Sequence, residues 1–179
     1  MKGIIFNLLE EAVSKEFGEA TWDKLLDEAN LSGAYTSLGS YGDDEIVALV
    51  AAASKALNLP TQDILRWFGQ SAMPSLATRF PNFFSSQPGT RSFLLTLNNT
   101  IHPEVHKLYP GAVTPMFDFA TSDGGSLVIG YSSPRKLCAL AEGFMRGAAK
   151  HFHEQADITQ PQCMHQGDSK CVFHVRFHQ

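Results

Sequence analysis

Two stretches of the chain carry side chains that could bind a metal ion and an acidic group. His102 offers an imidazole, the side chain that most often ligates metals in proteins. The segment Tyr131-Ser132-Ser133-Pro134-Arg135 offers hydroxyl groups and a guanidinium, which together can bind carboxylates. Tyr131 and Ser133 should point to the same side of a strand, because alternate residues share a face. The sequence therefore combines a candidate metal ligand with a cluster of anion-binding groups.

The same residues also fit ordinary structural roles. A single histidine on a helix is more often a surface residue than a ligand, and His106 lies one turn further along the same face. The polar segment fits a strand end followed by a serine that caps a helix, and this role is compatible with anion binding. Pro115, between the two stretches, fits an ordinary proline at the start of a strand.

The periodicity of apolar residues predicts the elements that position these groups. Helical spacing predicts helices over residues 4–13, 21–29, 40–58 and 60–73. Pro74 should end or kink the last of them, and residues 80–89 should form a loop before a helix that runs from Arg91 to His102. Alternation then predicts two hairpins, over 116–131 and 157–177, and residues 135–153 between them look like a long helix. The expected fold class is α+β, with a helical N-terminal half and a C-terminal half in which a four-stranded antiparallel sheet packs on helices.

Composition and charge exclude several classes of partner. With 44% apolar residues, the 179-residue chain can build a core that also encloses a large flat cofactor. The net charge is −4 and Lys and Arg are not clustered, so no nucleic-acid partner is expected. Glu10 and Glu11 come too early for a signal peptide, and no later stretch is long enough to span a membrane. Three cysteines fit a reducing compartment, so we expect a cytoplasmic protein without a membrane partner.

The two stretches and Pro115 resemble those of the haem nitric oxide/oxygen binding (H-NOX) family, in its stand-alone bacterial form. The similarity includes HPEVHKLYP, which begins at His102, and extends from the opening MKGIIFN to the final hairpin. The resemblance implies the H-NOX fold with haem b between the two halves. It further implies one domain, residues 1–179, with a helical subdomain over about 1–60 and a haem-ligating and sheet subdomain over about 61–179.

The resemblance also assigns roles to the residues of the two stretches. His102 would ligate the haem iron, and Pro115 would press on the haem and bend it. The haem propionates would bind to Tyr131, Ser133 and Arg135. Two buried carboxylates need such donors, because an unpaired buried charge is costly.

The residues expected opposite His102 bear on the choice of gas. Family members that bind O2 stably carry a tyrosine whose hydroxyl donates to bound dioxygen, whereas this chain has Leu140 at the corresponding place and Phe144 one turn further on. Neither side chain can donate, and NO needs no donor to bind ferrous haem. We therefore expect NO binding, with CO as a second ligand and O2 disfavoured. The expected apolar wall consists of Ile5, Met73, Leu140 and Phe144.

The resemblance implies a sensor and not an enzyme. In the family, NO binding breaks the iron–histidine bond, so the helix that bears His102 is freed and the two halves shift. A separate protein must read this change, and in bacteria the resemblance implies a histidine kinase or a cyclic-dinucleotide enzyme. A haem peroxidase is disfavoured, because no distal histidine–arginine pair is apparent on the helix before Pro74.

Three cysteines suggest a second function. Cys138, Cys163 and Cys171 come together if the long helix packs on the last hairpin, and some family members use three such cysteines and a histidine to bind zinc. The family's histidine position is occupied here by Gln160, so His165 or His174 would have to replace it. A redox- or zinc-responsive switch built on these thiols is therefore the alternative function, and buried cysteines without metal are the ordinary structural reading.

Overall fold

The computed structural model describes residues 1–178 and contains a helical N-terminal part followed by a mixed part. The helices before the sheet are α1 (Gly3–Phe17), α2 (Glu19–Ala29), α3 (Asp43–Leu57), α4 (Thr61–Arg79), α5 (Pro81–Ser85), α6 (Thr90–Leu95) and α7 (His102–Leu108). The second part consists of β1 (Met116–Thr121), β2 (Leu127–Ser132), α8 (Cys138–His151), β3 (Gln155–Gln162) and β4 (Cys171–His178).

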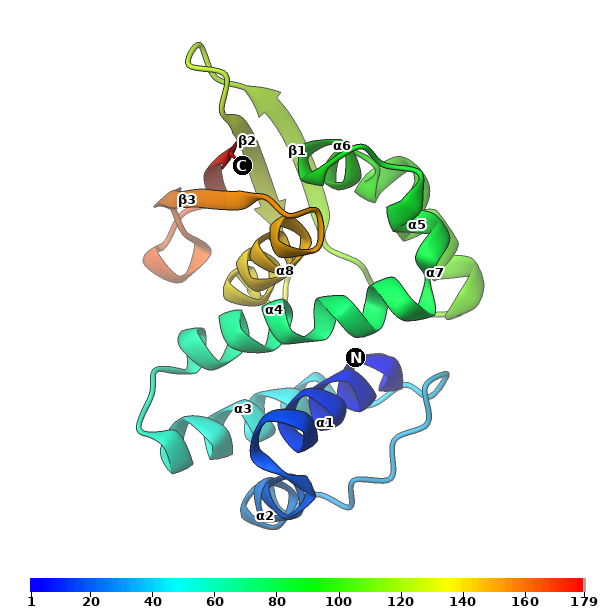
Figure 1. Ribbon diagram of the computed structural model, residues 1–179. Coiled ribbons are helices and arrows are strands. Elements are labelled where there is room, and N and C mark those ends of the chain that lie inside the picture. Colours follow the sequence, from blue (N-terminus) through cyan, green and yellow to red (C-terminus); the bar gives the residue numbers. More distant parts are fainter. Residues whose placement is uncertain (179) are drawn as a thin grey trace.

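Helices α1, α2 and α3 pack around one apolar core, and α4 separates them from the sheet (Figure 1). Asn30 and Asn58 end α2 and α3 in the left-handed conformation, which asparagine tolerates better than most residues. The core they enclose buries residues from α1, α2 and α3 together with Phe68 and Ala72 of α4 and Leu140 of α8. Its fully buried side chains include Phe6, Leu8, Ile46, Leu49 and Phe68.

Pro74 was expected to end or kink α4, and the first alternative is wrong, because the helix continues through this proline to Arg79. A proline inside a helix removes one backbone hydrogen bond. The surrounding packing outweighs this loss, because α4 makes its most extensive contact with α8 and buries Ala72 and Met73. A Cβ atom added to Gly69 or Gly143 would overlap backbone atoms of the other helix, so the two backbones approach closely at these glycines.

The four strands form one antiparallel sheet in the order β1-β2-β4-β3, and β1–β2 and β3–β4 are the two hairpins that the sequence predicts. Helix α8 packs against it through a second apolar core, which includes Met145 and Ala148 of α8, Ile129 of β2 and Phe173 of β4. In the register of β2 and β4, Tyr131 lies opposite Cys171. The expected α+β class is confirmed.

Two predicted boundaries are wrong. Helix α8 begins at Cys138, not at 135, because Lys136 adopts a left-handed conformation with φ of 51° and interrupts helical geometry. The expected loop over 80–89 contains the short helix α5, which starts at Pro81. Among residues 1–178, no helix has the length and apolar character needed to cross a bilayer.

Candidate functional site

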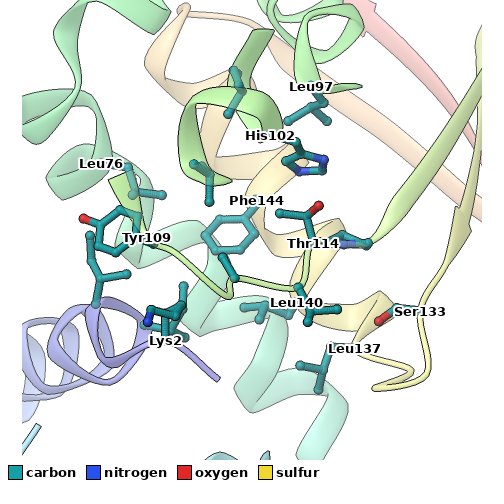
Figure 2. A pocket seen from close by; sticks show the side chains of 18 of the residues that line it. Lys2, Leu76, Leu97, His102, Tyr109, Thr114, Ser133, Leu137, Leu140 and Phe144 are labelled. Atoms are coloured by element: carbon teal, nitrogen blue, oxygen red, sulfur yellow. The ribbon is translucent and has the colours of Figure 1, made fainter. Parts of the chain in front are cut away.

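A cavity of about 370 Å³ lies between the two apolar cores, and most of its lining is apolar. Figure 2 shows side chains that enter it from helices on both sides and from the segment that leads into β1. The nine residues predicted to surround a cofactor all line this one cavity: Ile5, Met73, His102, Pro115, Tyr131, Ser133, Arg135, Leu140 and Phe144.

His102 reaches the cavity from an irregular point in the chain. The predicted continuous helix over 91–102 is wrong, because α6 ends at Leu95 and a π-helical turn over Leu97–Ile101 precedes α7. The backbone N–H of His102 donates to the carbonyl oxygen of Leu97, which is the i to i−5 pattern of a π-helix. Such turns are rare and occur frequently at functional sites.

The environment of His102 keeps its imidazole neutral. Burial disfavours the charged ring and, with a smaller contribution from His106, lowers the pKa of His102 to about 4. The ring packs beside Phe117, with ring centroids 5.8 Å apart. Its competitor His106 is exposed, and its Nε2 lies 3.2 Å from the Thr114 hydroxyl. A neutral imidazole is the form that ligates metals, and His102 lines the cavity whereas His106 does not, so His102 is the candidate ligand.

The end of β2 supplies the polar rim of the cavity. Tyr131 and Ser133 are buried while Ser132 between them is exposed, as the alternation of a strand requires. The Tyr131 hydroxyl accepts a hydrogen bond from the Leu137 N–H at 3.1 Å, and burial raises the pKa of this phenol. Ser133 does not cap α8. Its hydroxyl accepts from the Arg135 N–H at 3.3 Å and so supports the turn before the helix.

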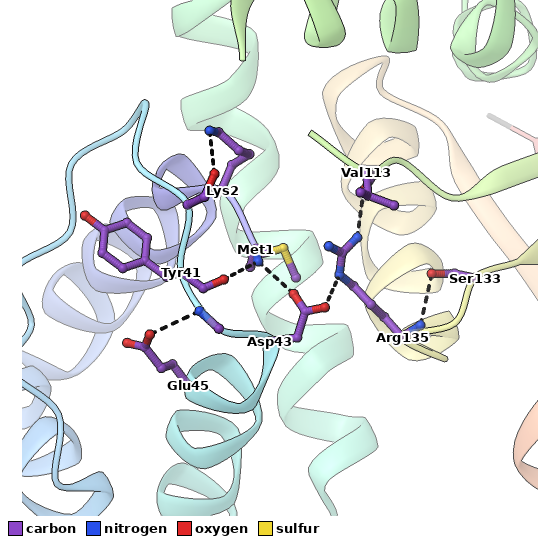
Figure 3. A network of polar contacts seen from close by, with 10 residues as sticks. Met1, Lys2, Tyr41, Asp43, Glu45, Val113, Ser133 and Arg135 are labelled. Carbon is purple, nitrogen blue, oxygen red and sulfur yellow. Dashed lines mark hydrogen bonds and ion pairs between the residues drawn. The ribbon is translucent and has the colours of Figure 1, made fainter. Parts of the chain in front are cut away.

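Arg135 joins this rim to the helical N-terminal part (Figure 3). Its Nε donates to the Asp43 carboxylate at 2.8 Å and its Nη1 donates to the Val113 carbonyl oxygen at 2.7 Å. The Met1 ammonium donates to the other Asp43 oxygen at 2.7 Å. Burial acts to raise the pKa of Asp43, but hydrogen bonds from Met1 and Arg135 outweigh it and lower this pKa. The two Arg135 bonds use two of its five N–H groups and leave three for a carboxylate in the cavity.

Leu140 and Phe144 of α8 form the side of the cavity that faces α1 and α4. Leu140 belongs to the N-terminal apolar core, whereas His102 packs on Phe117 of β1. Figure 2 shows Leu140 and Phe144 across the cavity from His102. Ile5 and Met73 line the same cavity, together with Ile4, Leu8 and Leu76, which sequence reasoning did not single out.

Three further hydroxyl groups line the cavity and were missed by sequence reasoning, those of Ser40, Tyr109 and Thr114. The Ser40 hydroxyl accepts a hydrogen bond from the Lys2 ammonium at 2.9 Å. Thr114 directs its hydroxyl to His106, and Tyr109 lies beside Leu76, away from Leu140 (Figure 2). Asp43 was also missed as a partner of Arg135, since an acidic residue in the first turn of a helix is ordinarily explained by the helix dipole. Pro115 lies directly before the edge strand β1, where its missing N–H costs no sheet hydrogen bond.

The three cysteines form a compact buried cluster at the start of α8, where Cys138 is the first residue of the helix. Their sulfur atoms all lie within 4.8 Å of one another, and Cys138 Sγ is 3.9 Å from Cys163 Sγ. Two sulfurs that each lie about 2.3 Å from a tetrahedral zinc ion would be about 3.8 Å apart, so the spacing fits zinc. Burial raises the pKa of the Cys138 thiol to about 12, and the neighbouring Gln160 side chain opposes this rise.

The structure does not place His165 among these ligands. Its Nε2 lies 2.7 Å from the Lys136 carbonyl oxygen and its side chain is exposed. The expectation that His165 completes a four-ligand set is therefore wrong in this structure, because the ring is held by the turn before α8. The predicted convergence of Cys138, Cys163 and Cys171 itself is observed.

Comparison with known proteins agrees with this geometry. The family model described as haem-NO-binding (HNOB) matches residues 2–160. The chain belongs to this family. An H-NOX protein from S. oneidensis in its Fe(II)NO ligation state is 34% identical, with a TM-score of 0.94 over all of both chains.

Other solved H-NOX structures agree. The H-NOX domain of Shewanella oneidensis in its Fe(II)CO ligation state is also 34% identical, with a TM-score of 0.90 over 100% of this chain and 99% of that one. The Fe(II) unliganded H-NOX protein of K. algicida is 27% identical, with a TM-score of 0.88 over 100% and 97% of the two chains. This chain therefore has the H-NOX fold, as the resemblance in sequence implied.

H-NOX domains bind haem and act as gas sensors, and the residues of this cavity fit haem. The cavity offers one neutral imidazole, an apolar interior and, at one rim, hydroxyl and guanidinium donors suited to two carboxylates. The membership assigns the chain to a family of haem-based sensors and not to a family of catalysts.

Proposed function

We propose that this H-NOX domain is a nitric oxide sensor that regulates a separate signalling protein. The observation that carries the proposal is the apolar wall across the cavity from His102, where Leu140 and Phe144 offer no hydrogen-bond donor. Bound haem would supply an iron that binds diatomic gases. Dioxygen gains negative charge when it binds iron, and a wall without a donor leaves that charge without a hydrogen bond. NO and CO do not depend on such a donor.

The remaining roles fall to residues around the rim. His102 would hold the iron from the start of α7, and Tyr131, Ser133 and Arg135 would bind the propionates. Pro115 would press on the face of the haem next to His102. We propose haem b, because the sequence lacks the Cys-x-x-Cys-His pattern that attaches haem covalently.

Release of His102 would provide the signal. His102 would tie α7 to the cofactor, so loss of this bond on NO binding would free α7 and would change contacts that depend on the position of the cofactor. Arg135 is one such contact, because it lies at the cavity and also pairs with Asp43 of α3. A two-state change of this kind needs another protein to read it. We propose a histidine kinase or a cyclic-dinucleotide enzyme as that partner, in the cytoplasm, where the three free thiols stay reduced.

Absorption spectroscopy of the ferrous protein tests the gas. The protein should bind NO and CO in the absence of oxygen and form no stable complex in air. The NO complex should lack the His102 bond, which resonance Raman spectroscopy of the iron–histidine stretch can follow before NO is added and after. A stable oxygen complex, or retention of the His102 bond in the NO complex, would refute the proposal.

The cysteine cluster favours a second candidate function, a redox- or zinc-responsive switch. Three sulfurs within 4.8 Å of one another suit a thiophilic metal, and thiolates that bind metal release it when oxidised. The test is the zinc content of reduced protein purified with added zinc, before and after treatment with hydrogen peroxide. One zinc per chain that is lost on oxidation supports this function, and Cys163→Ser should abolish the binding. Zinc-free protein under reducing conditions would refute it.

A further inference from the structure

The cysteine cluster has a glutamine where a fourth protein ligand would stand. Gln160 lies on the same face of β3 as Ile158, which packs on the sheet core. Gln160 acts to lower the pKa of the Cys138 thiol against the larger effect of burial, so the two side chains are neighbours, but no hydrogen bond joins them. The register of β3 and β4 shifts between Thr159 and Gln162, and irregularities of this kind redirect side chains.

The amide nitrogen of Gln160 is buried and, within residues 1–178, has no hydrogen-bond partner. A buried donor without an acceptor is unfavourable, so this group calls for an acceptor that the protein itself does not supply. An amide N–H2 donates hydrogen bonds and has no lone pair with which to ligate a metal. Gln160 in this orientation therefore faces the cluster as a donor and not as a ligand.

No histidine in the described part of the chain closes the cluster. The His165 ring is held at the Lys136 carbonyl oxygen, 2.7 Å away. His174 is exposed on β4, where alternation places it on the opposite face from Cys171. The nearby carboxylate of Asp168 accepts the Cys163 N–H at 2.7 Å and so holds the turn that positions this thiol.

We propose that Cys138, Cys163 and Cys171 bind zinc in an open site whose fourth position takes an exchangeable small ligand. Zinc with three protein ligands keeps the fourth position for water or for a molecule that replaces it. The ligand at that position is water or a small anion that accepts a hydrogen bond from the Gln160 amide. This inference rests on the zinc candidate above and is independent of NO sensing.

Zinc K-edge X-ray absorption of the reduced, haem-loaded, full chain tests the fourth position, because the signal is specific to zinc even when haem iron is present. The unmodified protein should show three sulfur neighbours and one oxygen or nitrogen neighbour without the scattering pattern of an imidazole ring. Added free imidazole should introduce that pattern. His165→Ala should behave as the unmodified protein, which makes it the matched control.

Two variants of Gln160 sharpen the test. Gln160→His should show the imidazole pattern without addition and no response to free imidazole. Its zinc should pass to a chromophoric chelator at least about tenfold more slowly, since even outer-shell partners contribute about 10–100-fold to metal affinity. Gln160→Leu should retain the three sulfur neighbours and the response to imidazole.

Three results would overturn the open site. An imidazole pattern in the untreated protein that disappears in His165→Ala would show that a protein histidine closes it. A response to free imidazole in Gln160→Leu but not in the unmodified chain would show that the Gln160 oxygen is the fourth ligand. Failure of both the unmodified chain and Gln160→His to retain zinc would refute the zinc candidate itself, while the haem spectrum would still report on NO sensing.

Discussion

The two walls of the cavity differ in their chemistry. One wall carries a neutral imidazole and several hydrogen-bond donors within a stretch of 34 residues, supplied by His102, Tyr131, Ser133 and Arg135. On the other side, α1, α4 and α8 present apolar side chains such as Leu140. The first wall can hold a charged cofactor, and the second can only shape the space left for a gas. Cofactor retention and gas selection should therefore respond to different substitutions.

Removal of the imidazole should have the largest effect. His102→Gly purified without added imidazole should contain little ordered haem, because no other histidine among the described residues lines the cavity. The Soret absorbance per chain measures this loss, and free imidazole should restore it. His106→Ala is the control, since that ring is exposed and bonds to Thr114. An unchanged ferrous spectrum in His102→Gly would exclude His102 as the ligand.

Loss of the Arg135 guanidinium should also weaken haem binding, but by less than loss of the His102 imidazole. A hydrogen bond to a charged group contributes about 1.5–3 kcal/mol, so Arg135→Ala should raise the dissociation constant of haem roughly tenfold to a hundredfold. The rate of haem transfer to an apo-globin acceptor measures it. Arg91→Ala serves as control, because Arg91 bonds to Gly125 and Thr121 near the β1–β2 turn. Equal transfer rates for Arg135→Ala and the unmodified protein would contradict propionate binding.

Substitutions at the contact between α4 and α8, two helices that carry the apolar wall, should affect stability rather than haem or gas binding. A Cβ at Gly143 would overlap the Arg66 carbonyl oxygen, so Gly143→Ala should lower the free energy of unfolding by about 1–3 kcal/mol. Urea denaturation of the haem-loaded protein measures the change. In Gly124→Ala, a Cβ would meet only ordinary contacts, and the change should stay within about 0.5 kcal/mol. Similar stabilities of the two variants would show that α4 and α8 can separate without cost.

A donor added to the apolar wall should have the smallest energetic effect but should change the selectivity. Leu140→Tyr adds one hydroxyl, which contributes about 1 kcal/mol net and more in a dry pocket, so oxygen affinity should rise by about fivefold or more. Oxygen titration of the ferrous protein measures it. Leu140→Phe adds the ring without the hydroxyl and should leave oxygen binding undetected. If both variants gain oxygen affinity equally, volume and not hydrogen bonding controls the choice of gas.

Much of the fold was predictable because local patterns and tertiary structure agree. The helical spacing in α1 to α3 and the two alternating hairpins appear as expected, since each exposes one face and buries the other. Pro74 and the π-helical turn before His102 were not predictable. In both places the packing of neighbouring elements decides the backbone, and a single sequence does not reveal which neighbour will be there.

The candidate site likewise contains residues that the sequence predicts and contacts that it does not. The nine residues named from the resemblance meet at one cavity, because the family pattern identifies residues by their place in a known fold. Partners peculiar to this chain were missed or misplaced. Asp43 lies 92 residues from Arg135 in the sequence. The His165 ring contacts the Lys136 carbonyl oxygen, which lies in the turn before α8. Neither contact has a signal in residue spacing.

The facing positions of Tyr131 and Cys171 link the two halves of the chemistry. Opposite residues of an antiparallel pair lie roughly 4.5–5.5 Å apart, so a displacement of Cys171 by metal or by oxidation would act on the strand that carries Tyr131. Tyr131 in turn lines the cavity. With haem bound, the absorption spectrum of the haem would respond to the state of the thiols. One absorption measurement would then follow both gas binding and thiol oxidation.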